Sequence, residues 1–291
     1  MNHPPVTGRF APSPTGDLHF GSLVSAVGSY LEAKSAGGKW LIRIEDIDPP
    51  REIAGSANRI IADLKNIGMV ADSPVLYQST RLHAYQQALN ELLDKGLAYH
   101  CGCSRKDLPA SGIYPGTCRN GLPEGRSPRA VRFRVGDRNH RFIDKLQGQI
   151  SDSPANIKGD FVVRRADGLF AYQLAVVIDD SFQGVTQVVR GTDLLDSTSG
   201  QIALQKALGL KTPEYMHLPL AISADGKKLS KRYQTDPLKS QKPETALEEA
   251  LRFLGQNPPP RLSLDDLWDW ALTHWNSSLI PRRRAILPGQ V

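Results

Sequence analysis

The chain has 291 residues, of which 40% are apolar and 23% charged, and its formal net charge at neutral pH is +6. This length is enough for one large domain or two modest ones with a real core. No apolar run approaches the roughly 18–20 residues of a membrane span, and the first residues lack the layout of a signal peptide. We therefore expect a cytoplasmic globular protein, with a modest positive charge that suits a polyanionic partner.

The first informative stretch is RFAPSPTGDLHFGS at 9–22, where two prolines and a glycine exclude a regular helix or strand. Apolar spacing predicts a helix over 23–31, and a compact apolar run predicts a strand over 40–44. A helix N-terminus attracts anions. His19 and Gly21, just before the predicted helix, are therefore candidate phosphate contacts, although a turn with a helix cap would explain them equally simply.

The acidic segment EDIDP at 45–49 follows the predicted strand. Acidic residues at the carboxyl end of a buried strand lie where open α/β sheets bind ligands. A solvated loop that ends at a proline is the alternative. Further apolar stripes predict helices over 51–67 and 81–93, which we interpret as core packing without a chemical role.

The composition changes at residue 99 and stays rich in Gly, Pro, Ser and Cys to about 128. This segment contains all three cysteines of the chain, namely Cys101, Cys103 and Cys118. Three thiolates can bind Zn²⁺ tetrahedrally when a fourth ligand is supplied, and such a metal stabilises a segment with few apolar residues. Three free thiols remain the alternative. The residue types leave the fourth ligand open among His83, His100, His140 and Tyr114.

Two strand-like runs at 130–135 and 160–163 suggest that a short α+β insertion spans about 99–160. We interpret the next two runs, 172–180 and 186–191, as buried strands. The first ends in Asp179 and Asp180 and the second ends near Arg190. A helix around 198–208 follows. Buried strands that end in charged residues at one edge indicate a ligand crevice.

The segment SADGKKLSKR at 223–232 combines an Asp-Gly turn with four basic residues. Such a loop could close on a triphosphate and neutralise its charge, and a basic surface loop is the alternative. The last sixty residues predict two helices, one over 244–254 and one that Ser263 caps. The arginines at 282–284 could contact a phosphate backbone or form a solvated tail.

Four separated segments, 9–22, 41–51, 172–197 and 227–232, together resemble, in order, the class I aminoacyl-tRNA synthetases for glutamate and glutamine. The resemblance implies an α/β fold, in which a zinc-bearing α+β insertion splits a Rossmann-like catalytic domain. It implies a division into catalytic halves, insertion and C-terminal helical region, with no anticodon-binding domain. The corresponding ranges are 1–98 and 161–232, 99–160, and 233–291.

Only about sixty residues follow the basic loop, which is too few for an anticodon-binding domain. In length the chain resembles the short branch of the family, the glutamyl-queuosine tRNA(Asp) synthetases. This implies a ligase that activates L-glutamate with ATP and Mg²⁺ in the absence of tRNA, and then esterifies the queuosine base in the anticodon of tRNA(Asp). It also implies a monomer with one structural zinc ion, bound by Cys101, Cys103, Tyr114 and Cys118.

The resemblance also assigns site residues by position. The glutamate pocket would consist of Arg9, Ala11, Ser13, Glu45, Tyr172 and Arg190. The ATP site would consist of His19, Gly21, Ser22, Lys228, Ser230 and Lys231, with His19 and Lys231 as the catalytic residues. Guanidinium groups bind carboxylates in bidentate fashion, and Glu45 can pair with the substrate ammonium. Catalysis would then consist of positioning and electrostatics, without an enzyme nucleophile.

Two residues depart from the family pattern. Ser22 stands where many class I enzymes have histidine, and Val176 stands where glutamyl-tRNA synthetases commonly have asparagine. The second departure suggests a rearranged contact with the amino acid. Three other functions compete with the main one: a minimal glutamyl-tRNA synthetase for tRNA(Glu), a non-catalytic RNA-binding paralogue, and a small-molecule nucleotidyltransferase of the same superfamily.

Overall fold

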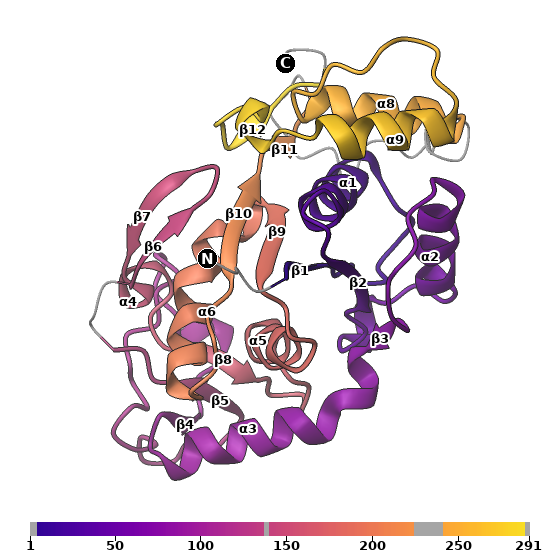
Figure 1. Cartoon of the computed structure of the whole chain (residues 1–291). Helices are drawn as coiled ribbons and strands as arrows, with labels where there is room; N and C mark the ends of the chain where they lie inside the picture. The colour runs from indigo at the N-terminus through magenta and orange to yellow at the C-terminus, as the bar shows by residue number, and fades with distance from the viewer. Residues whose placement is uncertain (1–4, 137–139, 224–240, 289–291) are drawn as a thin grey trace.

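The computed structural model describes residues 5–136, 140–223 and 241–288 (Figure 1). The predicted basic loop, with Lys228, Ser230 and Lys231, lies outside the described residues. Within the described ranges, no helix has both the length and the apolar composition needed to cross a membrane.

The centre of the molecule contains two sets of strands that meet edge to edge, and all their pairings are parallel except that of β6 with β7. The first set, in the order β1-β2-β3, consists of β1 (Thr7–Phe10), β2 (Lys39–Ile44) and β3 (Leu76–Tyr77). The second set, in the order β7-β6-β10-β9, consists of β6 (His140–Asp144), β7 (Gly148–Asp152), β9 (Gln187–Gly191) and β10 (Glu214–Leu218). The sets join because the Thr186 amide donates to the Thr7 carbonyl at 3.0 Å, and β1 lies beside β9 in Figure 1.

Helices cover these strands and form two hydrophobic cores. Five helices contribute to these cores, namely α1 (Phe20–Lys34), α2 (Ser56–Asn66), α3 (Leu82–Asp94), α5 (Tyr172–Phe182) and α6 (Leu195–Ala207). One core lies between α1, α2 and the C-terminal helices, and the other lies between α3, α5, α6 and the insertion. The predicted helices over 23–31, 81–93 and 198–208 are therefore confirmed, each with a slightly different start.

One predicted helix is shorter than expected, and one predicted strand was wrong. The helix expected over 51–67 begins only at Ser56, because Gly55 adopts a left-handed backbone (φ 74°) after a short 3₁₀ turn at Pro49–Arg51. The run 172–180 is the helix α5 and not a strand. A short apolar run does not distinguish a buried helix from a buried strand, and this helix is buried on several sides, with Leu174 and Val176 in the core. Asp179 and Asp180 consequently lie inside the protein and not at a strand end.

A separate antiparallel sheet, in the order β4-β5-β8, lies within and directly beside the stretch 99–160 that we predicted as an insertion. Its strands are β4 (Ala98–Cys101), β5 (Ala130–Phe133) and β8 (Phe161–Arg164), which confirms the two predicted strands. The long β4–β5 connection holds a 3₁₀ turn (Arg105–Asp107), and α4 (Pro154–Ile157) precedes β8. The β6–β7 hairpin belongs to the same stretch of sequence but pairs with β10, where Tyr215 is opposite Asp144. The insertion therefore also contributes to the central sheet.

The C-terminal region packs on the first half of the molecule. It consists of α8 (Pro243–Phe253), α9 (Leu264–His274), a 3₁₀ turn (Ser277–Leu279) and β12 (Ala285–Ile286), which pairs with β11 (Leu220–Ala221). Ser263 caps α9 as predicted, because its hydroxyl accepts from the Asp266 amide at 3.2 Å. The Trp268 indole donates to the Ile67 carbonyl at 2.6 Å. These helices thus complete the core above α1 (Figure 1).

Candidate functional site

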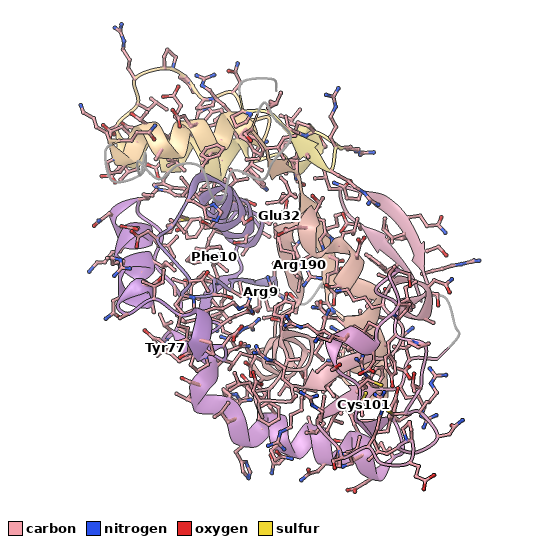
Figure 2. All side chains as sticks on the ribbon, turned by 180° about the vertical axis from the view of Figure 1, so that it is seen from behind. Arg9, Phe10, Glu32, Tyr77, Cys101 and Arg190 are labelled. Carbon is pink, nitrogen blue, oxygen red and sulfur yellow. The ribbon has the colours of Figure 1, made fainter. Side chains whose placement is uncertain are left out.

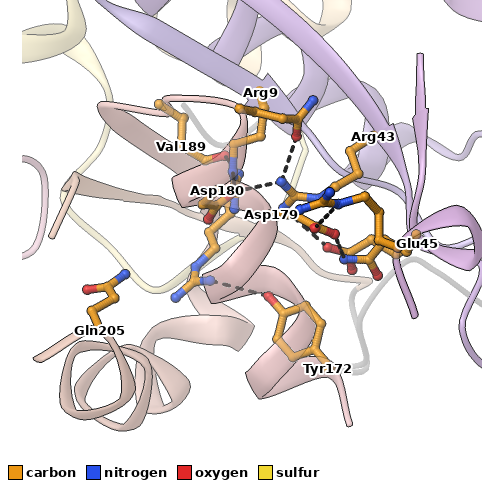
Figure 3. Close-up of polar contacts among 12 residues, drawn as sticks. Arg9, Arg43, Glu45, Tyr172, Asp179, Asp180, Val189 and Gln205 are labelled. Atoms are coloured by element: carbon orange, nitrogen blue, oxygen red, sulfur yellow. Dashed lines mark hydrogen bonds and ion pairs between the residues drawn. The ribbon is translucent and has the colours of Figure 1, made fainter. Parts of the chain in front are cut away.

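A buried group of charged residues lies where the two sets of strands meet. Arg9 lies on β1, and Arg43 lies on β2 with Glu45 just after it (Figure 3). Arg190 lies on β9. The junction between β1 and β9 is the point where strand order reverses, and ligands of open α/β sheets bind at such points beside the carboxyl ends of the strands. The structure therefore brings Arg9, Glu45 and Arg190, predicted from distant segments, to one region.

Asp179 and Asp180 hold this region together from α5. Asp180 accepts from Arg9 Nε at 3.1 Å and pairs with Arg43 Nη1 at 2.8 Å. Although burial opposes ionisation, the two guanidinium groups hold the pKa of Asp180 below its usual value. Asp179 accepts from Gln78, Arg81 and Tyr85, which ties α5 to the start of α3. Both acids are therefore occupied by internal contacts that orient the arginines.

Glu45 is the carboxylate of this group that lacks full pairing. Its Oε1 lies 3.6 Å from Arg43 Nη2, a charge contact too long for a hydrogen bond, and that oxygen has no hydrogen-bond partner. Only 8% of the residue is exposed. Burial raises the pKa of Glu45 to about 7, even though Arg43 and Arg9 act in the opposite direction. A buried carboxylate oxygen without a partner is costly, so this position suits a cationic ligand group.

Arg190 is fixed by contacts on each of its guanidinium nitrogens. Nη1 donates to the Tyr172 hydroxyl at 3.3 Å, which brings together two residues predicted for the same pocket (Figure 3). Nη2 donates to the Thr198 hydroxyl at 2.8 Å, and Nε donates to His217 Nε2 at 3.0 Å. Sequence reasoning missed Thr198 and His217. A buried arginine such as Arg190 needs hydrogen-bond partners, but nothing in the sequence around Thr198 or His217 identifies these two residues as the partners.

The loop between β1 and α1 is attached to the same strand ends. The Pro12 carbonyl accepts from the Glu45 amide at 2.9 Å, and the Pro14 carbonyl accepts from the Ile53 amide at 2.9 Å. Ala11 is half-buried and Ser13 is exposed on this loop. Both residues flank Pro12, whose carbonyl is bonded to the Glu45 amide.

His19 is the N-cap of α1. Its Nδ1 accepts from the Ser22 amide at 3.2 Å, while the Ser22 hydroxyl accepts from the His19 amide at 2.9 Å. A Cβ at Gly21 would lie 3.3 Å from His19 Cε1, so a larger residue there would press on the imidazole. The simple turn-and-cap interpretation is therefore confirmed. The cap contacts also hold His19 at the positive end of the α1 dipole. The Ser22 hydroxyl forms one of these contacts.

The three cysteines converge in a second site. The sulfur atoms of Cys101, Cys103 and Cys118 lie within 4.8 Å of one another, and Cys103 Sγ is 3.7 Å from Cys118 Sγ. Four sulfurs about 2.3 Å from a tetrahedral zinc would be separated by roughly 3.8 Å, so the spacing fits that metal. In Figure 2 Cys101 lies well away from Arg9 and Arg190, and the two sites are separate.

Tyr114 is the side chain that approaches these thiols. Its hydroxyl lies 3.4 Å from Cys101 Sγ and 3.8 Å from Cys103 Sγ. The chain can bring Tyr114 there because Gly159 lies against its backbone, where a Cβ would approach the Tyr114 carbonyl oxygen to 2.3 Å. His100 is exposed, and no histidine nitrogen in the described part of the chain joins the group. The donor set that fits zinc is thus three thiols and a phenol.

Arg132 supplies positive charge to this set. Its guanidinium lies 3.7 Å above the Tyr114 ring, and its Nε donates to Cys101 Sγ at 3.3 Å. Burial opposes ionisation of Cys101, but hydrogen bonds from Tyr114, from the backbone and from Arg132 lower the pKa of this thiol. Three thiolates and a phenolate would exceed the charge of one Zn²⁺, so the neighbouring guanidinium would stabilise such a metal site.

A cavity of about 1100 Å³ lies between the cysteine site and the loop after Glu45, and residues of both line it. Its lining is rich in positive charge and includes Arg51, Arg105, Arg129, Arg132, Lys158 and Arg165. Asp48 and Asp167 contribute opposite charge and pair with Arg165. The excess of basic side chains makes this cavity suited to a polyanion.

Comparison with known proteins agrees with this geometry. The family described as tRNA synthetases class I (E and Q), catalytic domain, matches residues 5–111 and 117–255. A protein of Dechloromonas aromatica named glutamyl-Q tRNA(Asp) synthetase is 51% identical over 295 residues, which cover 97% of this chain and 98% of the relative. The protein of the same name from Pseudomonas aeruginosa PAO1 is 49% identical, over 94% of this chain and 95% of the relative.

Two solved structures are similar over almost the whole chain. The glutamate tRNA ligase of Elizabethkingia meningosepticum, crystallised with its amino acid, has a TM-score of 0.81 and 27% identity. The glutamate-tRNA synthetase of Elizabethkingia anophelis has a TM-score of 0.80 and 29% identity. Each alignment covers 96% of this chain, but the chain spans only 66% and 67% of those two proteins.

Proposed function

The chain belongs to the family of class I tRNA synthetases for glutamate and glutamine, and from this premise we propose that it glutamylates queuosine in tRNA(Asp). In this proposal it first activates L-glutamate with ATP in the absence of tRNA. It then transfers the glutamyl group to the queuosine base in the anticodon. The near-complete coverage of relatives named glutamyl-Q tRNA(Asp) synthetase supports this function.

The unpaired oxygen of Glu45 is the observation that carries the amino-acid part of the proposal. Glutamate presents one ammonium and two carboxylates. A buried carboxylate that lacks a hydrogen bond, with Arg9 and Arg190 in the same region, matches that pattern of charge. The Tyr172 hydroxyl, already in contact with Arg190, would complete the pocket, and Ala11 and Ser13 would line it from the loop.

Activation would then proceed by direct displacement. An oxygen of the glutamate α-carboxylate attacks the α-phosphorus of ATP, the bond to the bridging oxygen breaks, and pyrophosphate leaves. His19, Gly21 and Ser22 at the start of α1 would contact the phosphates, together with Lys228, Ser230 and Lys231. Mg²⁺ bound with ATP would neutralise phosphate charge. In the second step a queuosine hydroxyl attacks the glutamyl carbonyl carbon, which forms the ester and releases AMP.

The zinc site and the division of the chain complete the proposal. Cys101, Cys103, Tyr114 and Cys118 would bind one structural Zn²⁺ within an insertion over 99–160, between catalytic halves at 1–98 and 161–232. Residues 233–291 would form the C-terminal helical region. The basic cavity beside the insertion supports an RNA partner. We propose that the protein acts as a monomer.

A glutamyl-tRNA synthetase of reduced length is the second candidate, since the similar solved structures are glutamate-tRNA ligases. Glutamate-dependent ATP–pyrophosphate exchange without tRNA separates the two, using wild type and Lys231→Ala. Exchange that disappears in the variant supports the proposal, whereas exchange that requires tRNA(Glu) supports the second candidate. Glutamate transfer to tRNA(Asp) with and without queuosine then tests the acceptor. Zinc-loaded protein without any exchange would contradict both candidates.

The pKa of Glu45 predicts how glutamate binding depends on pH. The substrate ammonium requires the ionised carboxylate, whose pKa is about 7 in the free protein. The KM for glutamate is therefore expected to fall about tenfold as the pH rises from 6 to 8, and to level off above that. The KM for ATP, measured in the same exchange assay, serves as the control and should change little. A KM for glutamate that is constant or rises over this range would contradict the role of Glu45.

A further inference from the structure

A fully buried polar network lies behind Arg190, on the side away from Tyr172. Asp144 Oδ2 lies 2.6 Å from His217 Nδ1, and His217 Nε2 lies 3.0 Å from Arg190 Nε. Neither Asp144 nor His217 exposes its side chain to solvent. Thr198 closes the group through its contact with Arg190 Nη2. These residues come from the β6–β7 hairpin, from β10 and from α6.

The chemistry of Arg190 determines the protonation of His217. A guanidinium offers hydrogen-bond donors and no acceptor, so His217 Nε2 must accept and cannot carry a proton. The ring proton must therefore lie on Nδ1, which donates to Asp144. Burial lowers the pKa of His217 to about 4; Asp144 opposes this shift, and Arg190 and Arg9 add to it. The imidazole is thus neutral and of one tautomer at physiological pH.

Asp144 is itself held in one orientation. Its Oδ1 accepts from the amides of Leu146 at 3.0 Å, Gln147 at 2.8 Å and His217 at 3.2 Å. Burial opposes ionisation, but these contacts and the His217 ring keep the pKa of Asp144 below its usual value. The Gln147 side chain also donates to the His217 carbonyl at 2.9 Å. Oδ2 is the oxygen left to face the imidazole.

We propose that Asp144 and His217 are positioning residues for the amino-acid site, because they fix the tautomer that holds the Arg190 guanidinium ready for a substrate carboxylate. The inference rests on the proposed role of Arg190 in binding glutamate. The hairpin that carries Asp144 lies within the predicted insertion but reaches the catalytic sheet at β10. The insertion therefore supports the amino-acid pocket as well as the cysteine site.

The substitution Asp144→Asn reverses this hydrogen-bond pattern with almost no change in shape. Three backbone amides face Oδ1, so the amide oxygen of asparagine must occupy that place. Its NH₂ group then faces His217 Nδ1, which has to accept. The ring proton moves to Nε2, which can donate to the Thr198 hydroxyl 3.2 Å away but can no longer accept from Arg190 Nε, so the guanidinium loses this contact.

The test compares D144N, H217Q and H217L with wild type in glutamate-dependent ATP–pyrophosphate exchange. We expect the KM for glutamate to rise about 10–100-fold in D144N and H217L, with the KM for ATP within about twofold of wild type. H217Q should recover most of the loss, since its side-chain oxygen can accept from Arg190. Nitrogen-15 NMR of the histidine rings should show the His217 proton on Nδ1 in wild type and on Nε2 in D144N.

Tyr215→Phe is the matched control. Tyr215 is buried, stacks on His217 and accepts from Gln205 at 3.0 Å, so this variant loses a buried hydrogen bond beside the network without touching Arg190 Nε. Its KM for glutamate should be unchanged. Three results would overturn the positioning role alone. The KM for glutamate and the KM for ATP could rise equally, the KM for glutamate could stay unchanged in D144N, or the His217 ring proton could lie on Nε2 in wild type. Failure of wild type to catalyse any exchange would overturn the proposed function, and the positioning role with it.

Discussion

Replacing Glu45 with glutamine is expected to raise the KM for glutamate by about 10²–10⁴-fold. The substrate ammonium would bind close to the guanidinium groups of Arg9 and Arg43, which repel it. Glu45 is the carboxylate there whose Oε1 has no hydrogen-bond partner, so it supplies the attraction. Loss of one partner of a buried charge pair costs about 3–5 kcal/mol, which corresponds to that range. The exchange assay without tRNA measures it directly.

The same substitution is expected to make the protein more stable at alkaline pH. The pKa of Glu45 is about 7 in the folded protein, above the ordinary value of 4.5. A pKa raised by folding favours the native state below pH 4.5, and that contribution is lost as the pH rises through 7. At pH 8 the ionised side chain costs about 3 kcal/mol, which glutamine avoids. Thermal unfolding should therefore show a higher Tm for E45Q at pH 8 and little difference near pH 5.

Glu91→Gln is the control for both measurements, because Glu91 forms an exposed pair with Lys95 on the helix α3. Exposed pairs of this kind contribute little, so neither the KM for glutamate nor the pH dependence of the Tm should change. If E45Q bound glutamate as well as wild type, or lost stability at pH 8 as well as at pH 5, Glu45 would be a structural residue and not a ligand for the ammonium.

Removal of the proposed zinc ion is expected to unfold the connection between β4 and β5 while the rest of the protein stays folded. The apolar cluster in this segment consists of little more than the cysteines, Tyr114, Tyr99, Leu108 and Leu122. A metal contributes most of the folding free energy of such a small unit. The β4-β5-β8 sheet should persist, because Val131, Phe133 and Phe161 belong to the larger core.

Limited trypsin digestion with and without a chelator measures this effect. We expect rapid cleavage at Arg105, Arg119 and Arg126 only after chelation, with protection restored by added Zn²⁺. Cleavage within α1 or α6 serves as the internal reference and should stay slow. Equal resistance of the segment before and after chelation would contradict a structural metal.

Tyr114→Phe separates the phenol from the thiols at the same site. Its hydroxyl lies 3.4 Å from Cys101 Sγ and accepts from the Cys118 amide at 2.9 Å. We expect the affinity for zinc, measured by competition with a chromophoric chelator, to fall at least tenfold. Tyr99→Phe is the matched control, because it also removes a phenol hydroxyl beside the cluster, but one that donates to the Asp160 carboxylate. Equal zinc affinities for the two variants would exclude Tyr114 as a ligand.

Local patterns in the sequence were sufficient for several parts of the fold. Periodic apolar residues predicted α1 and α3, and the Ser263 cap was correct because helix caps depend on neighbours along the chain. The cysteines were recognisable as a group because they are close in sequence. The resemblance added Arg9, Glu45 and Arg190, which the structure brings to one region, and it added Tyr114, which spacing alone left among four candidates.

Other features depended on contacts between distant segments. The run 172–180 has the composition of a buried strand or a buried helix, and packing against α3 and α6 decides for the helix. Asp180 was expected at a strand end, yet it lies between Arg9 and Arg43, more than 130 residues away in the sequence. Asp144 and His217 are 73 residues apart. Hydrogen-bond partners and pKa values depend on contacts between residues that are distant in the sequence. The sequence by itself therefore determined most of the elements that form, whereas the tertiary structure decided which side chains meet.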